Sequence, residues 1–390
     1  MVMAHVRGEE IPSVTDVDGS DVRVTWHALH TVKDAQCKAT DVVTVVDASD
    51  CGAAYRFLMP ILAATPGRWL LTGTPRLLQR PIMPLVDVLL GIGADIERVE
   101  DGWLILGKSF RSVETQCIAS LQSSETNTND GNSLSLTIDA SQSSQMASAL
   151  VLAAPLLGLK TLRLITTDIP SLSYLRMTLA LTRDWPVEVP GVEVPDIPVG
   201  APGDWSAALF WFAHARLHPG NEYLLAPLSL NSIQGDSIVA KWFNMLDVSV
   251  REDAMHGDST PSCIEIVAKP LAAMPRMALD VRDNLDTVPV MAALAALLPA
   301  DITFQNVRNL RYKESDRLQS LAEQLAPYAE IELSDNVLRV CGRGGQIVPA
   351  ASFDTHHDHR LAMAFLLFPG AVLDNVGCLE KSYPGLSEQI

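Results

Sequence analysis

The chain has 390 residues, of which 48% are apolar, and a formal net charge of −17 at pH 7. This length indicates two domains, each with enough apolar residues for a buried core. The negative charge excludes nucleic acid as a partner, because phosphate-backbone binding needs a basic surface. A few arginines can still form a locally positive site for small anions.

Other classes of protein are excluded by the distribution of particular residues. No apolar stretch is long enough to span a bilayer, and the N-terminal residues do not form a signal peptide. The six cysteines are scattered without a Cys-x-x-Cys pair, which argues against a zinc cluster and a disulfide scaffold. These features predict a cytoplasmic protein without membrane association.

One pattern recurs along the chain: a helix with an apolar face, a strand, a turn and a second strand. Copies are predicted at residues 85–106, 238–267 and 318–340, and a partial copy at 172–189. Asp-Gly at 101–102 and Asp-Asn at 335–336 suit hairpin turns. This recurrence predicts a fold built by repetition of one unit.

A segment rich in proline and glycine, residues 186–203, separates two halves of similar length. Its prolines prevent a continuous helix or a central strand. We therefore expect a domain boundary at about residue 200, with an N-terminal domain at 1–200 and a C-terminal domain at 201–390.

The most informative stretch is the charged run at residues 309–317, which precedes a predicted amphipathic helix. Ser315 is predicted to cap this helix. Lys313 and Arg317 would add positive charge to a helix start that already attracts anions, and Glu314 beside them could carry a proton. A solvated, salt-bridged helix start is the alternative.

Four more motifs accompany this run: Gly-Thr-Pro-Arg-Leu-Leu-Gln-Arg-Pro-Ile at 73–82, Ser-Ser-Gln at 143–145, Thr-His-His-Asp-His-Arg-Leu-Ala-Met-Ala at 355–364 and Glu-Lys-Ser-Tyr-Pro at 380–384. By itself, the cluster of three histidines and Asp358 could instead bind a metal ion. In this order, however, the segments from about Asp21 to Ile390 resemble the EPSP synthase family, the 3-phosphoshikimate 1-carboxyvinyltransferases.

This resemblance implies a fold and a reaction. The fold would be of the mixed α and β class: a two-domain enolpyruvyl-transferase fold, or inside-out α/β barrel, built of repeated βαβαββ units with ligands in the cleft between domains. The enzyme would transfer the enolpyruvyl group of phosphoenolpyruvate to the 5-hydroxyl of shikimate 3-phosphate and release phosphate. No cofactor or metal would be needed, and the chain would be a monomer.

The resemblance also implies roles for individual residues. Asp286, Glu314 and Lys381 would be catalytic. Phosphoenolpyruvate would be bound by Gly52, Arg80, Arg317, Arg360 and Lys381. Shikimate 3-phosphate would be bound by Ser143, Ser144, Gln145, Ser171, Tyr174, Asp286 and Lys313, and His359 would orient groups near Arg360.

Each of these residues also has a purely structural interpretation. Arg80 could be an ordinary surface residue, and Tyr174 could pack in a core. Asp286, Ser143 and Ser144 could be helix caps, although a cap is compatible with phosphate binding. The functional interpretation rests on the motifs occurring together.

The sequence also departs from the family pattern. Family members open with a Lys-Ser pair and then an Asn-Arg pair, and neither is present here. Contacts to both substrates would be missing, so a truncated or degenerate homologue that binds the ligands without turnover is the alternative. Ala53 replaces a hydroxyl residue and Asp50 an asparagine, and altered sensitivity to glyphosate-like inhibitors is expected.

A related family offers a second enzymatic alternative. The UDP-N-acetylglucosamine enolpyruvyl transferases share the fold but use a reactive cysteine on a glycine-rich loop. No cysteine here has that context, and the Lys-Glu-Ser-Asp-Arg run at 313–317 favours shikimate 3-phosphate.

Overall fold

The computed structural model describes residues 1–15, 18–36, 42–110, 133–157, 161–166, 168–196, 203–253, 262–344 and 352–390. The chain divides into two compact units, unit 1 (Met1–Pro195) and unit 2 (Asp196–Ile390). The boundary expected at about residue 200 falls among residues 197–202, outside the described part. None of the described helices has the length and apolar character that crossing a membrane requires.

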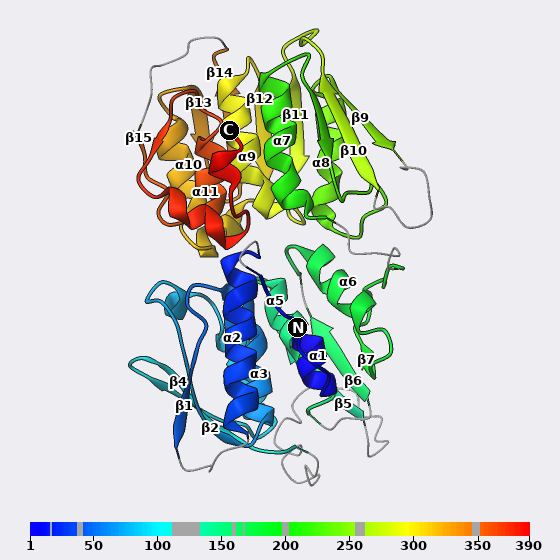
Figure 1. Ribbon diagram of the computed structural model, residues 1–390, viewed down its shortest axis with the longest axis vertical. Helices are drawn as coiled ribbons and strands as arrows, with labels where there is room; N and C mark the ends of the chain where they lie inside the picture. Colours follow the sequence, from blue (N-terminus) through cyan, green and yellow to red (C-terminus); the bar gives the residue numbers. More distant parts are fainter. Residues whose placement is uncertain are drawn as a thin grey trace. The chain divides into compact units, whose positions relative to one another are not determined.

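The elements of unit 1 are α1 (Val2–Arg7), α2 (Ser20–Ala35), β1 (Val43–Asp47), α3 (Gly52–Ala64), β2 (Gly67–Thr72), η1 (Leu77–Gln79), α4 (Met83–Gly91), β3 (Asp95–Val99), β4 (Gly102–Gly107), β5 (Ser133–Ile138), α5 (Ser144–Ala153), β6 (Thr161–Thr166), α6 (Leu172–Leu181) and β7 (Val187–Glu188). Figure 1 shows their arrangement within the unit.

The elements of unit 2 are α7 (Trp205–Leu217), β8 (Glu222–Leu225), η3 (Gly235–Ile238), α8 (Val239–Asn244), β9 (Val248–Asp253), β10 (Cys263–Ala268), β11 (Arg276–Asp280), η4 (Leu285–Thr287), α9 (Val288–Leu297), β12 (Asp301–Gln305), η5 (Arg308–Tyr312), α10 (Arg317–Leu325), β13 (Ala329–Leu333), β14 (Val337–Gly342), β15 (Ser352–Phe353), α11 (His359–Phe365), β16 (Val372–Leu373), η6 (Val376–Lys381) and η7 (Leu386–Glu388).

One four-stranded sheet in each unit has the same topology. In unit 1 the order is β1-β2-β4-β3, with β1 and β2 parallel and the other two pairs antiparallel. In unit 2 the order is β11-β12-β14-β13 with the same directions. Each sheet is one βαβαββ unit, so the repetition expected from the sequence is confirmed.

The remaining sheets are smaller. Strands β5, β6 and β7 form a parallel sheet in which β7 is an edge, and β8-β10-β9 is antiparallel. Strands β15 and β16 are a short parallel pair. The sequence copy at 238–267 corresponds to α8, β9 and β10, and the partial copy at 172–189 to α6 and β7.

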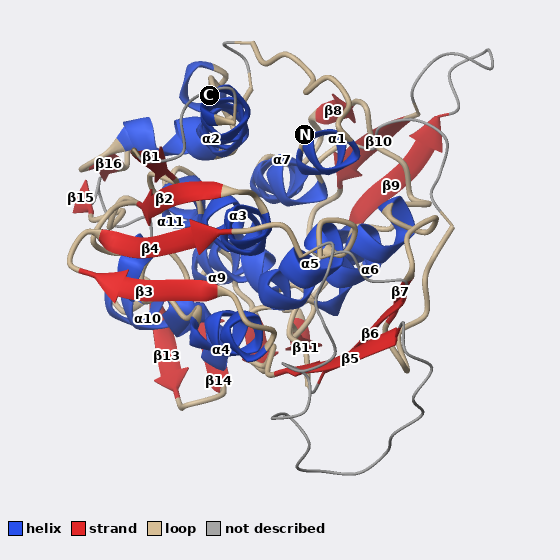
Figure 2. Ribbon diagram, turned by 90° about the horizontal axis from the view of Figure 1, so that it is seen from below, coloured by secondary structure: helices blue, strands red, loops and turns tan. Residues whose placement is uncertain are grey.

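Helices fill the interior of each unit, and sheets lie outside them. In unit 2, residues Val288–Ala296 of α9 are buried, and α9 packs against α7, α10 and α11. A helix that is apolar on all sides must be buried in this way. In unit 1, α3 packs against α5, and Figure 2 shows these helices between the β1–β4 and β5–β7 sheets. This arrangement agrees with the inside-out fold expected.

The junctions between strands and helices carry most of the predicted site residues. In the β1–β4 sheet, Gly52 starts the helix after β1, and Arg80 follows β2. In the β11–β14 sheet, Asp286 lies in the turn after β11, and residues 313–317 follow β12. Because β1 is parallel to β2 and β11 to β12, both junctions of a sheet lie at one edge, where α/β folds usually bind ligands.

The predicted cap of the helix at 317 is wrong by one residue. Asp316 is the N-cap of α10, and its Oδ1 accepts a hydrogen bond from the backbone N–H of Gln319 at 3.0 Å. The hydroxyl of Ser315 instead donates to Asp358 at 3.0 Å. A buried carboxylate far away in the sequence therefore determines the orientation of Ser315.

Candidate active site

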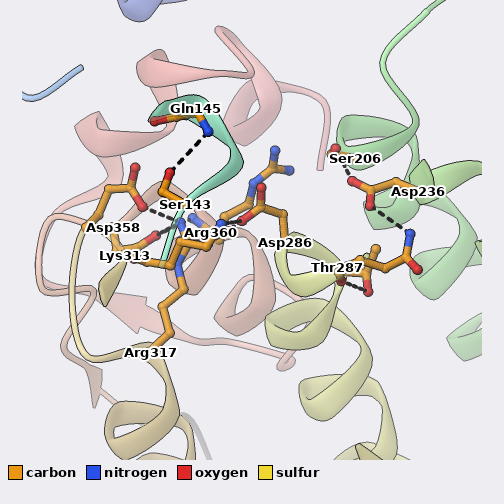
Figure 3. A network of polar contacts seen from close by, with 12 residues as sticks. Ser143, Gln145, Ser206, Asp236, Asp286, Thr287, Lys313, Arg317, Asp358 and Arg360 are labelled. Atoms are coloured by element: carbon orange, nitrogen blue, oxygen red, sulfur yellow. Dashed lines mark hydrogen bonds and ion pairs between the residues drawn. The ribbon is translucent and has the colours of Figure 1, made fainter. Parts of the chain in front are cut away.

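Arg317 is the centre of a polar network in unit 2 (Figure 3). Its side chain is 1% exposed. Its Nη1 donates to Asp286 at 2.7 Å, and its Nη2 donates to Glu314 at 2.8 Å. Nε and Nη2 together hold Asp358, at 2.7 and 3.0 Å. One guanidinium group thus contacts three carboxylates. These ion pairs keep the group charged although it is buried.

Asp286 lies in the turn η4, between β11 and the buried helix α9. Oδ1 accepts hydrogen bonds from Arg317 and, at 3.1 Å, from Nζ of Lys313. Burial opposes ionisation of this carboxyl, but the charges of Lys313, Arg317 and Arg360 outweigh it and hold the pKa of Asp286 well below its usual range. Thr287, not Asp286, occupies the N-cap of α9, so the capping interpretation of Asp286 is wrong.

Asp358 is fully buried and caps α11 by accepting a hydrogen bond from the backbone N–H of Arg360 at 2.9 Å. Burial opposes its ionisation, but the charge of Arg317 holds the pKa of Asp358 below its usual range. Next to it, burial and the charge of Arg360 lower the pKa of His359 to about 3. His359 is therefore neutral at physiological pH and adds no cation to the site.

The metal-binding interpretation of this loop gains no support. His357 Nδ1 lies 2.7 Å from the side-chain amide of Asn375, and His356 Nδ1 lies 3.3 Å from Asp354. His359 Nδ1 is 4.0 Å from Asp358. In the part of the chain that the structure describes, no three metal-ligating side chains are grouped to hold an ion.

Arg360 and Lys381 are also buried in unit 2, at 7% and 4% exposure. Arg360 lies in the first turn of α11, where its charge acts on both Asp286 and Asp236. Lys381 ends the 3-10 helix η6, which packs against α11. Burial of two cations on neighbouring elements is costly unless anions are close.

In unit 1, the start of α3 brings Gly52 against two arginines. A Cβ atom on Gly52 would lie 2.5 Å from Nη1 of Arg80 and 3.0 Å from Nη1 of Arg56. Only glycine allows both guanidinium groups to approach this backbone so closely. Arg80 is 9% exposed, so its interpretation as an ordinary surface residue is wrong.

Arg56 was not predicted as a site residue, although it is four residues after Gly52 and therefore on the same face of α3. Its Nη1 donates to Oε1 of Gln145 at 2.8 Å. Its Nε and Nη2 donate to the carbonyl of Pro81, at 3.2 and 2.8 Å, and fix the segment that carries Arg80. Through Arg56, the predicted residues Gly52, Arg80 and Gln145 are brought together.

The serines expected to bind shikimate 3-phosphate lie at two helix starts. Ser143 caps α5, and its Oγ accepts a hydrogen bond from the backbone N–H of Gln145 at 3.3 Å (Figure 3). Ser144 is 4% exposed. Ser171 precedes α6 in the left-handed region, at φ 54°, and the half-buried Tyr174 is in the first turn. Because α5 and α6 follow the parallel strands β5 and β6, their N-termini share one edge.

Comparison with known proteins identifies the family. The sequence profile of EPSP synthase (3-phosphoshikimate 1-carboxyvinyltransferase) matches residues 18–390. The chain belongs to the EPSP synthase family. A 3-phosphoshikimate 1-carboxyvinyltransferase of Bacteroides fragilis is 30% identical over 406 residues, which cover 99% of this chain and 89% of that protein. The enzyme of Nostoc punctiforme is 30% identical over 351 residues, covering 85% of this chain and 75% of its own.

Solved structures agree at the level of the fold. The EPSP synthase of Acinetobacter baumannii superposes with a TM-score of 0.63 at 18% identity, covering 95% of this chain and 87% of that chain. The mixed α/β enolpyruvyl-transferase fold and the EPSP synthase family expected from the sequence are therefore both confirmed.

Proposed function

We propose that this chain carries out the reaction of the EPSP synthase family: transfer of the enolpyruvyl group from phosphoenolpyruvate to the 5-hydroxyl of shikimate 3-phosphate, with release of phosphate. The observation that carries the proposal is the pair of acids on one guanidinium, Asp286 at 2.7 Å and Glu314 at 2.8 Å from Arg317. The reaction needs two proton-transfer groups beside fixed positive charge, and these three residues supply them.

Asp286 is proposed as the base that removes the proton of the 5-hydroxyl. In the free chain it is a weak base, because Lys313 and Arg317 keep its pKa low. An anionic substrate that draws these cations toward its own phosphate or carboxylate would weaken their hold on Asp286. The pKa of Asp286 would then rise toward the range of a useful base. Substrate binding would itself prepare the base.

Glu314 is proposed to handle the proton of the enolpyruvyl methylene, and Lys381 to assist it. Four bonds from Arg317 go to protein carboxylates, so this residue mainly orients Asp286 and Glu314. Counting only bonds to residues that the structure describes, one of the five guanidinium N–H groups of Arg317 remains for phosphoenolpyruvate. The expected phosphoenolpyruvate clamp would then depend on Arg80, Arg360 and Lys381, with the backbone of Gly52.

The residues Ser143, Ser144, Gln145, Ser171 and Tyr174 are proposed to bind shikimate 3-phosphate, together with Lys313 and Asp286. Two helix N-termini at one edge of unit 1 present backbone N–H groups and hydroxyls, which suit a phosphate group. We also propose that the chain acts as a cytoplasmic monomer. Its four described cysteines are free thiols, which agrees with a reducing compartment.

The test is phosphate release from phosphoenolpyruvate in the presence and absence of shikimate 3-phosphate. Release that requires both substrates, and that falls roughly 10²- to 10⁴-fold in Glu314→Gln, supports the proposal. Glu323→Gln is the matched control, because Glu323 is exposed on α10, the helix that follows Glu314. Tight binding of both substrates without any release would favour the non-catalytic homologue.

A further inference from the structure

A second buried carboxylate lies outside the network of Arg317. Asp236, in η3, is 1% exposed. Burial, together with the negative charge of Asp286, raises the pKa of Asp236 to about 6. No motif in the sequence marked this residue, and the proposed reaction does not use it directly. A carboxylate that is buried needs hydrogen-bond donors to compensate for its lost hydration.

Two side chains from different elements supply those donors. The hydroxyl of Ser206, in α7, donates to Oδ2 of Asp236 (Figure 3). The side-chain amide of Asn284 donates to Oδ1 of Asp236 at 3.3 Å. Gln234 Nε2 donates to Ser206 Oγ at 3.0 Å and to the capping Asp204 at 2.9 Å. The carboxylate is therefore fixed to the start of α7.

Asn284 is also the first residue of the turn that carries Asp286. Its carbonyl accepts hydrogen bonds from the backbone N–H of Thr287 at 3.0 Å and from the hydroxyl of Thr287 at 2.6 Å. Its own N–H donates to the carbonyl of Val281 at 2.9 Å. A contact that fixes the side chain of Asn284 thus fixes both ends of the turn around Asp286.

We propose that Asp236 is a positioning residue for Asp286, which it holds in place by anchoring Asn284 and the turn 284–287 to α7. This inference rests on the proposed function, in which Asp286 is the base. The role of Asp236 differs from that of Arg317, Lys313 and Arg360, which act on Asp286 by charge. Asp236 acts through the backbone of the turn.

The proposal has a consequence for the pH dependence of turnover. The charged groups that face Asp236 are Asp286 from η4 and Arg360 from α11, with Asp204 one hydrogen bond further away through Gln234. A proton on Oδ1 would meet the amide donor of Asn284 and weaken the anchor. In the free chain Asp286 stays ionised far below pH 6. A fall of kcat/KM near pH 6, which reports groups of the free chain and free substrates, would therefore come from Asp236 and from the substrate phosphates, whose second pKa is also about 6.

The experiment compares kcat and KM from pH 5 to 8 for wild type and Asp236→Asn. In the variant we expect kcat to fall roughly 10- to 100-fold with little change in KM, because a slightly misplaced base slows chemistry more than binding. The fall in activity toward low pH, here called the acid limb, should lose the part that comes from protonation of Asp236. Asn284→Ala should lower kcat similarly, and the double variant should add little. Asp301→Asn, at an ion pair elsewhere in unit 2, should keep wild-type kcat.

Ser206→Ala is a milder change that tests the direction in which the acid limb moves. The hydroxyl of Ser206 lowers the pKa of Asp236, so its removal should move the acid limb to higher pH. Loss of packing alone would not shift the limb in that direction. The variant also keeps the test decisive if Asp236→Asn does not fold.

Two outcomes would overturn the proposal: a kcat and acid limb in Asp236→Asn equal to wild type, or an acid limb unmoved in Ser206→Ala. If wild type itself releases no phosphate, the proposed function fails, and hydrogen exchange decides the anchor separately. Faster exchange of the Thr287 amide in Asp236→Asn supports the anchor, and unchanged exchange rejects it.

Discussion

Arg317 and Asp358 form a two-point ion pair in which neither side chain is more than 1% exposed. The pair connects α10 with the start of α11, across 41 residues of sequence. Asp358 also receives hydrogen bonds from Ser315 and from the backbone of Arg360. The two motifs that identify the family in the sequence are therefore one structural element, held together by this pair.

Loss of this carboxylate should be severely destabilising. Asp358→Asn leaves the buried charge of Arg317 without its main partner, and we expect a loss of about 3–5 kcal/mol in the free energy of unfolding. Urea unfolding followed by circular dichroism measures it. Asp301→Asn, whose partner Arg339 is 35% exposed, should cost much less. Equal losses in the two variants would contradict the importance assigned to the buried pair.

Gly52→Ala should impair substrate binding while leaving stability nearly intact. The added methyl displaces the flexible ends of Arg80 and Arg56, and alanine favours the helix. We expect KM for phosphoenolpyruvate to rise roughly 10- to 100-fold. Gly220→Ala is the opposite control: its Cβ meets nothing within 4 Å, but φ is +94°, so stability should fall by about 1 kcal/mol with unchanged KM. The same response from both variants would reject this explanation.

Neutral His359 should make unit 2 sensitive to acid. Its pKa is about 3 in the folded chain and about 6.5 when unfolded, so the unfolded state binds more protons between these values. Stability should therefore fall as pH drops from about 6.5 toward 3, by up to about 5 kcal/mol from this residue. In His359→Gln the loss over that range should be smaller, as measured by urea midpoints at pH 7 and 4.5. The exposed His356→Gln controls for removal of an imidazole from the same loop.

Ser143 should have two separable roles. Ser143→Ala removes the cap of α5 and should cost about 1 kcal/mol of stability, while raising KM for shikimate 3-phosphate. Ser143→Asn can still cap the helix but lacks the hydroxyl, so stability should be retained and KM should still rise. Calorimetric unfolding and steady-state kinetics separate the two effects. A KM that recovers in the asparagine variant would show that Ser143 serves only as a cap.

The sequence was a good guide to local structure. Helix periodicity and the Asp-Gly and Asp-Asn turns placed α4, β3 and β4, and likewise α10, β13 and β14, within a few residues of their observed bounds. These signals are local, because the bounds of each helix and hairpin depend on residues within the same repeat. The motifs also brought Asp286, Lys313, Glu314 and Arg317 into one set, which the structure joins by hydrogen bonds.

What the sequence could not give were contacts that depend on burial and distant pairing. Asp358 was noticed as one of several possible metal ligands, but its role as partner of Arg317 depends on the packing of α10 and α11. Arg56 has no local signal apart from its spacing to Gly52. Asp236 lies in an unremarkable Gln-Gly-Asp run, and only its burial between Ser206 and Asn284 gives it meaning. The N-cap of α10 was misplaced for the same reason.

The β1–β4 and β11–β14 sheets share one topology, but the residues at their corresponding strand–helix junctions differ. At the first junction, one copy places Gly52, whose backbone two arginines approach closely, and the other places an acid, Asp286. At the second junction, one copy places Arg80 and the other the run containing Glu314 and Arg317. Under the proposed function, the copy in unit 1 would bind substrate anions, and the copy in unit 2 would also supply the groups that transfer protons. One backbone arrangement therefore positions two different sets of side chains at corresponding junctions.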